Sequence, residues 1–449
     1  MSSEAAPRRR FALSIRERRV ILAALDFLVG ALACYVAFVV LRHPHLRQLE
    51  FYEPLVIGGF WVVGLLVADG YASQIPSDRL ESGVAVIKAL PIASLLSILI
   101  FFLHPYVLTR SVIAFALVLG AVLLIAFRTT GARLLLHESL ATRVILVSDS
   151  SPSPDVVAAL DAARFEYRVA EMLIRSDGED IVHQLRPLLE QTGAEEVIVT
   201  GNELRLVPGL VEECLTHSVR LVTAGDVVER YMGRVPLDSV DVHWYLGLPT
   251  SDVWRRPYAF ARRTSDLVLA VVFGIPFLLL LPLLALAIRL DSRGPVLLTQ
   301  RRVGEGGCNF NLIKLRTMTE DAEAAGAQFA AAGDPRVTRV GRLLRVTRLD
   351  EIPQLWNIIR GDMSFIGPRP ERPEFVSDLE ATIPHFRSRL LLKPGLTGWA
   401  QIRGGYASTV PEITRKLEYD LYYIKNRSLR LDLQILFGTF STLLGRRGR

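Results

Sequence analysis

Residues 266–290 read DLVLAVVFGIPFLLLLPLLALAIRL, and this apolar run decides how the chain is organised. The run is long enough to cross the roughly 30 Å hydrocarbon core of a bilayer. Pro282 falls in its middle, where a proline removes a helix hydrogen bond and forces a kink. We predict a re-entrant membrane helix that breaks at Pro282 and returns to the side it came from; the alternative is a plain crossing. Pro276 adds a second interruption, and basic residues on both flanks favour two cytoplasmic ends; they are Arg262, Arg263, Arg289, Arg293, Arg301 and Arg302.

Four further apolar runs precede this one, at residues 20–41, 51–69, 84–103 and 111–127. Each approaches the length of a membrane span, and arginines cluster before the first run and after the fourth. We therefore predict a cytoplasmic tail at 1–19 and four transmembrane helices within 20–130, with both ends in the cytoplasm. The second run is the weakest because Gly58, Gly59 and Gly64 dilute it. A buried four-helix bundle of a soluble protein is the alternative. The first run is too long for a signal peptide and has no A-x-A site, so we expect a retained anchor.

Composition supports a membrane protein that acts on charged molecules. The chain has 449 residues, enough for two or three domains, and half of them are hydrophobic although 22% are charged. The net charge of +6 suits anionic lipid or phosphorylated substrates. Nucleic acid is excluded as a partner because long apolar spans serve no purpose there. The three cysteines are far apart and predict neither a disulfide framework nor a zinc site.

Residues 140–245 follow a different pattern, in which short β-branched runs alternate with helical stretches. Strands are predicted at 143–147, 167–174, 196–200 and 219–223, with helices at 154–163, 179–191 and 208–217. Such alternation predicts a parallel α/β domain. Its first turn, residues 148–154, contains no glycine, whereas a dinucleotide-binding turn needs glycines so that backbone N–H groups can approach a pyrophosphate. We expect a structural or regulatory role rather than cofactor binding.

The C-terminal part carries a series of short motifs in a fixed order. They are VLLTQRRVG (296–304), KLRTM (314–318), LDEIPQLWN (349–357), GDMSFIGPRP (361–370) and KPGLTG (393–398). Asp350 and Glu351 are adjacent carboxylates at the start of a predicted helix, with Pro353 tolerated in its first turn. The helix dipole favours the ionised carboxylate there, and an ionised aspartate can attack phosphorus as a nucleophile.

Phosphoryl transfer needs positive charge around the phosphate oxygens, and basic residues surround the carboxylate pair in the sequence. Arginines recur at every third position from 336 to 348 and lead directly into LDEIPQ. A divalent ion is the usual supplement, and Mg²⁺ suits a sparse carboxylate site that leaves room for substrate oxygens and water. The alternative is a capping carboxylate pair beside a solvated arginine face. The cations that we predict to bind phosphate are Lys314, Arg316, Arg345 and Arg369.

In this order the motifs resemble the bacterial sugar transferase family, the polyprenyl-phosphate glycosyl-1-phosphate transferases. The resemblance implies a large family member: a membrane helical bundle, a degenerate Rossmann-like α/β domain, and a mainly α-helical catalytic domain at 258–449 with the re-entrant helix near 266–290. It places the protein in the bacterial inner membrane with the catalytic domain facing the cytoplasm. It is compatible with a homodimer. The sugar cannot be chosen from the residues.

The resemblance also implies a two-step reaction that initiates exopolysaccharide, capsule or O-antigen synthesis. Asp350 would attack the β-phosphorus of a UDP-sugar, release UMP and hold the phosphosugar covalently until undecaprenyl phosphate attacks. Mg²⁺ would sit against Asp350 and the diphosphate, Arg345 and Arg369 would grip phosphate oxygens, and Lys314 would lie close by. Glu351 would act as a base, orient Asp350 or help the metal. Asp362 is a weaker candidate that would stabilise the loop before residues 367–370.

Two departures from the family pattern concern packing and the helix break. Leu315 replaces the usual aromatic of the KLRTM block, and Leu281 stands where the family often has a serine before its proline. The tail at 429–437 predicts either an amphipathic helix on the membrane surface or ordinary core packing.

Two other functions remain as alternatives. A membrane-anchored nucleotide-sugar dehydratase would need G-x-G-x-x-G and Y-x-x-x-K, and the sequence contains neither. A non-enzymatic scaffold for polysaccharide assembly would tolerate the loss of Asp350 or Arg369.

Overall fold

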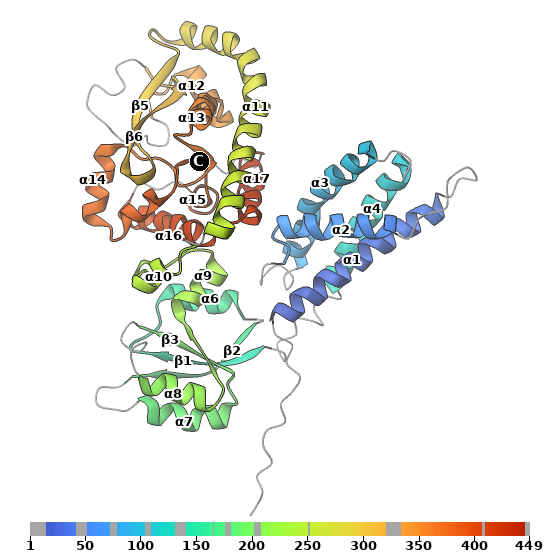
Figure 1. The fold of residues 1–449 in the computed structure, drawn as a ribbon, viewed down its shortest axis with the longest axis vertical. Helices are drawn as coiled ribbons and strands as arrows, with labels where there is room; N and C mark the ends of the chain where they lie inside the picture. Colours follow the sequence, from blue (N-terminus) through green and yellow to red (C-terminus); the bar gives the residue numbers. More distant parts are fainter. Residues whose placement is uncertain are drawn as a thin grey trace, which may run out of the picture. The chain divides into compact units, whose positions relative to one another are not determined.

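The fold was described from a computed structural model, shown in Figure 1. The structure describes residues 15–41, 52–71, 79–103, 109–130, 141–164, 166–175, 181–201, 208–249, 252–319, 334–405 and 409–444. The chain divides into two compact units, Met1–Met232 and Gly233–Arg449. The basic tail at 1–14 and the arginines at 446, 447 and 449 lie outside the described residues.

The first unit begins with a bundle of apolar helices. These are α1 (Ile15–Val40), α2 (Tyr52–Val67), α3 (Arg79–Leu103) and α4 (Arg110–Thr130), as predicted. Among the described residues, α1, α3, α4 and the later helix α11 are long and apolar enough to cross a membrane. These helices indicate membrane integration. Helix α2 has 16 residues, about 24 Å at 1.5 Å per residue, so its crossing stays a prediction.

Two of the three glycines that weaken the second run, Gly58 and Gly64, lie where α2 touches its neighbours. A Cβ on Gly58 would lie 2.6 Å from the Phe27 carbonyl oxygen, and one on Gly64 would lie 2.8 Å from the Ala89 carbonyl oxygen. Small residues permit this close packing in membrane bundles. A buried ion pair adds a polar contact: Arg128 donates to Asp26 at 2.7 and 3.2 Å, and both side chains are fully buried.

The α/β region forms the parallel sheet that the alternating pattern predicts. Its strands are β1 (Thr142–Ser148), β2 (Tyr167–Ile174), β3 (Glu196–Thr200) and β4 (Arg220–Thr223), in the order β2-β1-β3-β4. The central pair β1 and β3 is buried along its length except at the start of β1. The connecting helices are α6 (Pro154–Ala162), α7 (Ile181–Thr192) and α8 (Pro208–Thr216), followed by α9 (Ala224–Met232).

The second unit begins earlier than the predicted catalytic domain. Residues 233–245, which we predicted to belong to the α/β domain, pack into the core of the second unit. Val235, Val240 and Trp244 are buried there. The Trp399 indole N–H donates to the Gly233 carbonyl at 2.7 Å. This segment contains η3 (Leu237–Ser239) and α10 (Val242–Leu246).

Helix α11 (Asp252–Asp291) is one helix of 40 residues, and Pro276 and Pro282 both lie inside it. The prediction that Pro282 breaks the run into two helices is therefore wrong. A proline removes one hydrogen bond, and the neighbouring turns keep the chain helical; Figure 1 shows α11 curving over at its yellow end instead of stopping. One stripe packs against the rest of the unit while the remainder is exposed: Ala270, Phe273, Phe277, Leu281, Leu284 and Ile288 form the packed stripe.

The remaining elements of the second unit are short helices and small sheets around one core. Strands β5 (Leu297–Val303) and β6 (Asn309–Leu315) form an antiparallel hairpin around η4 (Glu305–Gly307), and β7 (Ser364–Ile366) pairs in parallel with β8 (Gly395–Thr397). The helices are α12 (Arg339–Thr347), η6 (Leu349–Gln354), α13 (Leu355–Arg360), α14 (Pro373–Thr382), η7 (Phe386–Leu391), α15 (Trp399–Arg403), α16 (Val410–Asn426) and α17 (Leu429–Leu444).

Helix α17 packs one face into the core of the second unit, and the interpretation of its other face as a membrane surface stays a prediction. Leu431 and Ile435 are buried in the core of the second unit. Leu429, Leu433 and Phe437 are exposed large hydrophobic residues.

Candidate active site

The carboxylate pair lies in the 3-10 helix η6, not in the first turn of an α-helix. Asp350 is 8% exposed and Glu351 is 9% exposed. Arg348 ends α12 with a left-handed backbone, φ +58°, and turns the chain into η6. The α-helix α13 starts only after Gln354 and is six residues long. The predicted stabilisation by an α-helix dipole therefore does not apply, and the charge on the pair must be balanced by side chains.

Two arginines balance Glu351. Its Oε1 accepts a hydrogen bond from Arg369 at 2.8 Å and one from Arg348 at 3.4 Å. Burial acts to raise the pKa of Glu351, but Arg369 and Arg348 outweigh it, so the pKa lies below its ordinary value. Glu351 in turn raises the pKa of Arg369. Glu351 is thus a fixed anion whose charge is used to hold two cations.

Asp350 has a different environment although it is the next residue. Its Oδ1 is buried and has no hydrogen-bond partner among the described residues. Burial, followed by the charge of Glu351, raises the pKa of Asp350 to about 6, while Arg348, Arg345 and Arg369 act against the rise. A carboxylate of this kind is more basic than a free aspartate yet mostly ionised at pH 7, which suits a nucleophile.

Lys314 lies in the electrostatic field of the same group. Burial, together with the charges of Arg302 and Arg369, lowers the pKa of Lys314 to about 8, while Asp350 opposes the change. The hairpin strand β6 carries Lys314 and is tied to the helix after the carboxylates. Asn357 on α13, which is fully buried, donates to the Asn311 carbonyl at 2.8 Å and accepts from the Ile313 N–H at 3.2 Å.

Arg345 reaches the site from α12. Its Nε donates to the Thr317 hydroxyl at 2.9 Å, directly after β6. Gly341 allows this packing, because a Cβ there would lie 2.1 Å from the Thr317 carbonyl oxygen. Arg345 therefore faces the carboxylates from a helix that is fixed against the KLRTM segment.

Arg369 is presented by a tightly packed loop between β7 and α14. A Cβ on Gly395 would lie 2.1 Å from the Gly367 nitrogen, and one on Gly398 would lie 2.2 Å from the Gly367 oxygen. The glycines of the GPRP and KPGLTG motifs thus permit direct contact of two backbone segments. This contact fixes the base of the loop that carries Arg369.

Comparisons with known proteins agree with this geometry. Residues 257–446 match the family described as Bacterial sugar transferase. A UDP-glucose:undecaprenyl-phosphate glucose-1-phosphate transferase of Caulobacter vibrioides is 44% identical over 185 residues, which are 41% of this chain and 69% of that protein. The chain belongs to the bacterial sugar transferase family.

Two more relatives in this family differ in length and description. A UDP-N-acetylgalactosamine-undecaprenyl-phosphate N-acetylgalactosaminephosphotransferase of Aeromonas hydrophila is 44% identical over 232 residues, 51% of this chain. The match spans only about half of that relative, 54% of its length. Exopolysaccharide production protein PSS of Rhizobium leguminosarum bv. phaseoli is 38% identical over 42% of this chain and 92% of its own length.

In this family member Arg316 does not point its charge at the carboxylate pair, contrary to the prediction. Arg316 is 5% exposed. Its Nη2 donates to the Ser292 carbonyl at 2.7 Å, and its Nη1 donates to the Arg293 carbonyl. Arg316 therefore fixes the chain after α11, and its motif position gave no sign of this because the sequence does not show which carbonyls are near.

Two cations of the site were not among the predicted site residues. Arg348 contacts Glu351, and its position directly before LDEIPQ was the available signal. Arg302, on β5 and about a dozen residues before Lys314 in the chain, contributes to lowering the pKa of Lys314 across the hairpin. Only the pairing of β5 with β6 could reveal that proximity.

A metal would find few protein ligands in this site. The described residues contain no group of three or more His, Cys, Asp or Glu that could hold an ion. Glu351 is occupied by two arginines, which leaves the unpartnered oxygen of Asp350. One carboxylate fits Mg²⁺ only where phosphate oxygens and waters complete the coordination.

Proposed function

We propose that this protein transfers a sugar 1-phosphate from a UDP-sugar to undecaprenyl phosphate and releases UMP, as the initiating step of exopolysaccharide, capsule or O-antigen synthesis. The observation that carries the proposal is Asp350, a buried carboxylate that lies inside a group of cations and has one oxygen without a hydrogen-bond partner in the part of the chain that the structure describes. The long apolar helix α11 in the same unit would bring a lipid acceptor to the site. The activities for which the Caulobacter and Aeromonas relatives are named support the same reaction.

The chemistry divides into two displacements at one phosphorus. The Asp350 carboxylate oxygen forms a bond to the β-phosphorus, and the bond from that phosphorus to the bridging oxygen breaks, with its electrons leaving on UMP. An oxygen of the lipid phosphate then attacks the same phosphorus, and the bond to Asp350 breaks. Lys314, Arg345, Arg348 and Arg369 stabilise the negative charge that spreads over the phosphate oxygens.

Glu351 has a positioning role in this proposal. Its carboxylate is held by Arg369 and Arg348, so it orients these cations instead of accepting a proton. Mg²⁺ is the proposed cofactor, with Asp350 as its protein ligand, and it would supply additional positive charge to the diphosphate.

The donor sugar is the property that the experiment must name, because the two relatives differ in theirs. We would measure UMP release from a panel of UDP-hexoses and UDP-N-acetylhexosamines with undecaprenyl phosphate and Mg²⁺. One donor should give UMP that depends on both metal and lipid. If every donor is inert with the lipid acceptor present, the transferase function is wrong and a scaffold role gains support.

We also propose that α11 is re-entrant, with the second unit on the cytoplasmic side. The packed stripe of α11, from Ala270 to Ile288, touches the same unit along its length. At the start of the apolar run of α11, Asp266 accepts from the Phe365 N–H at 2.9 Å, and at the end of the helix Asp291 accepts from the Val340 N–H at 2.8 Å. A helix crossing the bilayer would separate these two ends by the thickness of the membrane.

A native cysteine can test this topology. Cys308, in the β5–β6 turn, is exposed, whereas Cys34 and Cys214 are buried. A membrane-impermeant maleimide should label Cys308 in inside-out vesicles and not in intact spheroplasts, with Cys308→Ser as the control. Labelling in intact spheroplasts would show that α11 crosses the membrane.

A further inference from the structure

The loop that presents Arg369 is fastened mainly through its carbonyl oxygens. Pro368 and Pro370 have no N–H groups, so this segment has few donors with which to tie itself down. Arginine side chains from three other elements supply the donors. Arg262 donates to the Ile366 carbonyl, Arg389 to the Arg369 carbonyl at 2.9 Å, and Arg302 to the Pro370 carbonyl at 3.1 Å.

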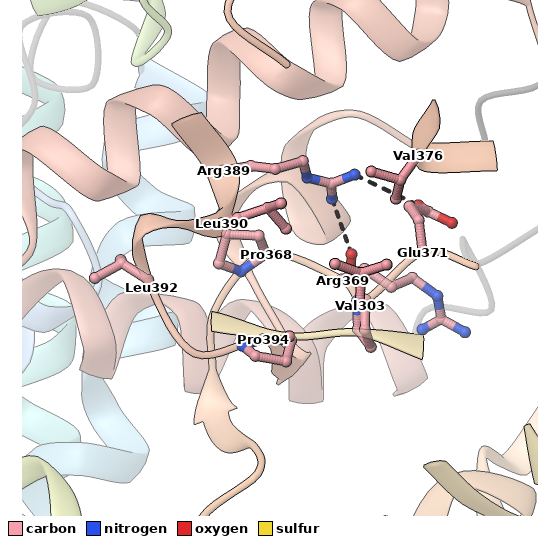
Figure 2. Close-up of a pocket in the computed structure, with 11 residues that line it drawn as sticks. Val303, Pro368, Arg369, Glu371, Val376, Arg389, Leu390, Leu392 and Pro394 are labelled. Carbon is pink, nitrogen blue, oxygen red and sulfur yellow. Dashed lines mark hydrogen bonds and ion pairs between the residues drawn. The ribbon is translucent and has the colours of Figure 1, made fainter. Parts of the chain in front are cut away.

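Arg389 is the most buried of these three arginines, with 6% exposure of the residue. Besides the Arg369 carbonyl, its Nη2 lies 3.0 Å from an oxygen of Asp420 on α16, and its Nη1 lies 3.8 Å from an oxygen of Glu371. Figure 2 shows the Arg389 guanidinium over the loop, with dashed lines to Arg369 and Glu371. Asp420 is itself buried, so the pair joins two distant segments inside the protein.

The arrangement places Arg389 between the core and the backbone of a substrate-binding residue. The Arg369 side chain holds Glu351 at 2.8 Å, while its own carbonyl is held by Arg389. A buried ion pair is a weak source of stability, because desolvation offsets much of its attraction. Its geometry, by contrast, can hold a neighbouring group in place, as a supporting shell does in active sites.

We propose that Arg389 and Asp420 are positioning residues for the transfer reaction: Asp420 orients Arg389, and Arg389 fixes the backbone of Arg369 so that its guanidinium meets both Glu351 and the phosphate. This inference rests on the proposed function. Lysine cannot replace Arg389, since one ammonium lacks the planar fork that reaches a carbonyl and two carboxylates together.

The test is a double-mutant cycle on UMP release in the full-length protein. Arg389→Met should lower kcat about 100-fold, the loss expected when a catalytic group is misplaced by about 1 Å. Arg389→Lys should not restore it. Arg387→Met is the matched control, because Arg387 lies on the same helix η7 and is exposed; its kcat should stay within about twofold of the parent.

The cycle separates positioning from general damage. If Arg389 acts through Arg369, the double variant Arg389→Met/Arg369→Met should be no slower than Arg369→Met alone. If the kcat of the double variant falls by the product of the two single losses, or if Arg389→Met keeps full activity, the inference is overturned while the proposed function stays intact. An inert parent protein would instead count against the proposed function.

A milder variant covers the case in which Arg389→Met does not fold. Asp420→Asn keeps the shape and one acceptor, and it should lower kcat about tenfold with its thermal transition close to that of the parent. Unchanged kcat in Asp420→Asn would contradict the role given to Asp420.

Discussion

Two polar regions of this protein can be compared: the carboxyl ends of β1 and β3 in the α/β sheet, and the carboxylate pair in η6. Both regions contain an aspartate with cationic side chains near it: Asp149 at the sheet and Asp350 in η6. At the sheet, the Ser148 hydroxyl bonds the Thr200 hydroxyl and the Ser150 carbonyl. Asp149 lies close to Gly201, because a Cβ on this glycine would be 2.1 Å from the Asp149 Oδ2 atom. The Arg175 Nη1 atom lies 3.8 Å from the Asp149 Oδ1 atom.

The difference concerns what the polar groups are used for. At the sheet edge, the hydroxyl groups of Ser148 and Thr200 bond with each other, and Ser148 also donates to a backbone carbonyl. Asp149 and Asp350 each have an oxygen without a hydrogen-bond partner among the described residues, but Asp350 is more buried and has three arginines around it. Open sheets often bind ligands where the strand order reverses, which here is between β1 and β3, where the Ser148 and Thr200 hydroxyls bond with each other. The two aspartates therefore differ in burial and in the number of cations around them.

The largest expected effect is the contrast between the two aspartates. Asp350→Asn removes the nucleophile with little change in shape and should lower UMP release by at least about 10³-fold. Asp149→Asn should leave the rate within about twofold of the parent. Equal losses in the two variants would mean that the α/β region takes part in the reaction, and full activity of Asp350→Asn would exclude the covalent mechanism.

The next effect concerns the fixed anion. Glu351→Gln leaves Arg369 and Arg348 without their charged partner, and we expect kcat to fall about 100-fold, with a smaller change in KM. Glu380→Gln, at an exposed position of α14, is the control. Steady-state UMP release measures both parameters. A change confined to KM would show that Glu351 contributes only to substrate binding.

A third expectation addresses the packing under the Arg369 loop. Gly395→Ala places a methyl group against the Gly367 backbone and should destabilise the second unit by about 2 kcal/mol. Gly83→Ala, whose Cβ would meet nothing within 4 Å, should be neutral or slightly stabilising. Thermal unfolding in detergent compares the two. A transition temperature in Gly395→Ala equal to that of the parent would contradict the close approach of β7 and β8.

The smallest effect is a dependence on pH. Asp350 must be ionised to attack, so activity should fall as pH decreases through about 6; Lys314 must be protonated to bind phosphate, so activity should fall as pH rises through about 8. On each side of the optimum, the rate of UMP release should approach a tenfold decrease per pH unit. Lys314→Arg keeps its charge at higher pH and should move only the alkaline limb upward. An unchanged alkaline limb would remove Lys314 from the ionisations that control the rate.

Prediction from sequence succeeded where a residue's role follows from local chemistry. Short runs rich in β-branched residues located the strands of the sheet within a residue or so, because the central strands of a parallel sheet are buried on both faces and are continuously apolar. Asp350, Glu351, Lys314, Arg345 and Arg369 are brought into one electrostatic group, as their motifs predicted. Arg316 and Pro282 were misinterpreted, since the partners of a guanidinium and the response of a helix to a proline depend on surrounding structure.

By itself, the sequence determined that apolar helices are present, that an α/β region lies between them and the C-terminal part, and that the motifs are those of the family. These properties depend on composition, spacing and residue type. Only the tertiary structure decided which of two adjacent carboxylates is paired with arginines and which keeps an unpartnered oxygen, and which arginines face phosphate or hold a carbonyl. The physical reason is that pKa and hydrogen bonding depend on burial and on neighbours brought together from distant parts of the chain.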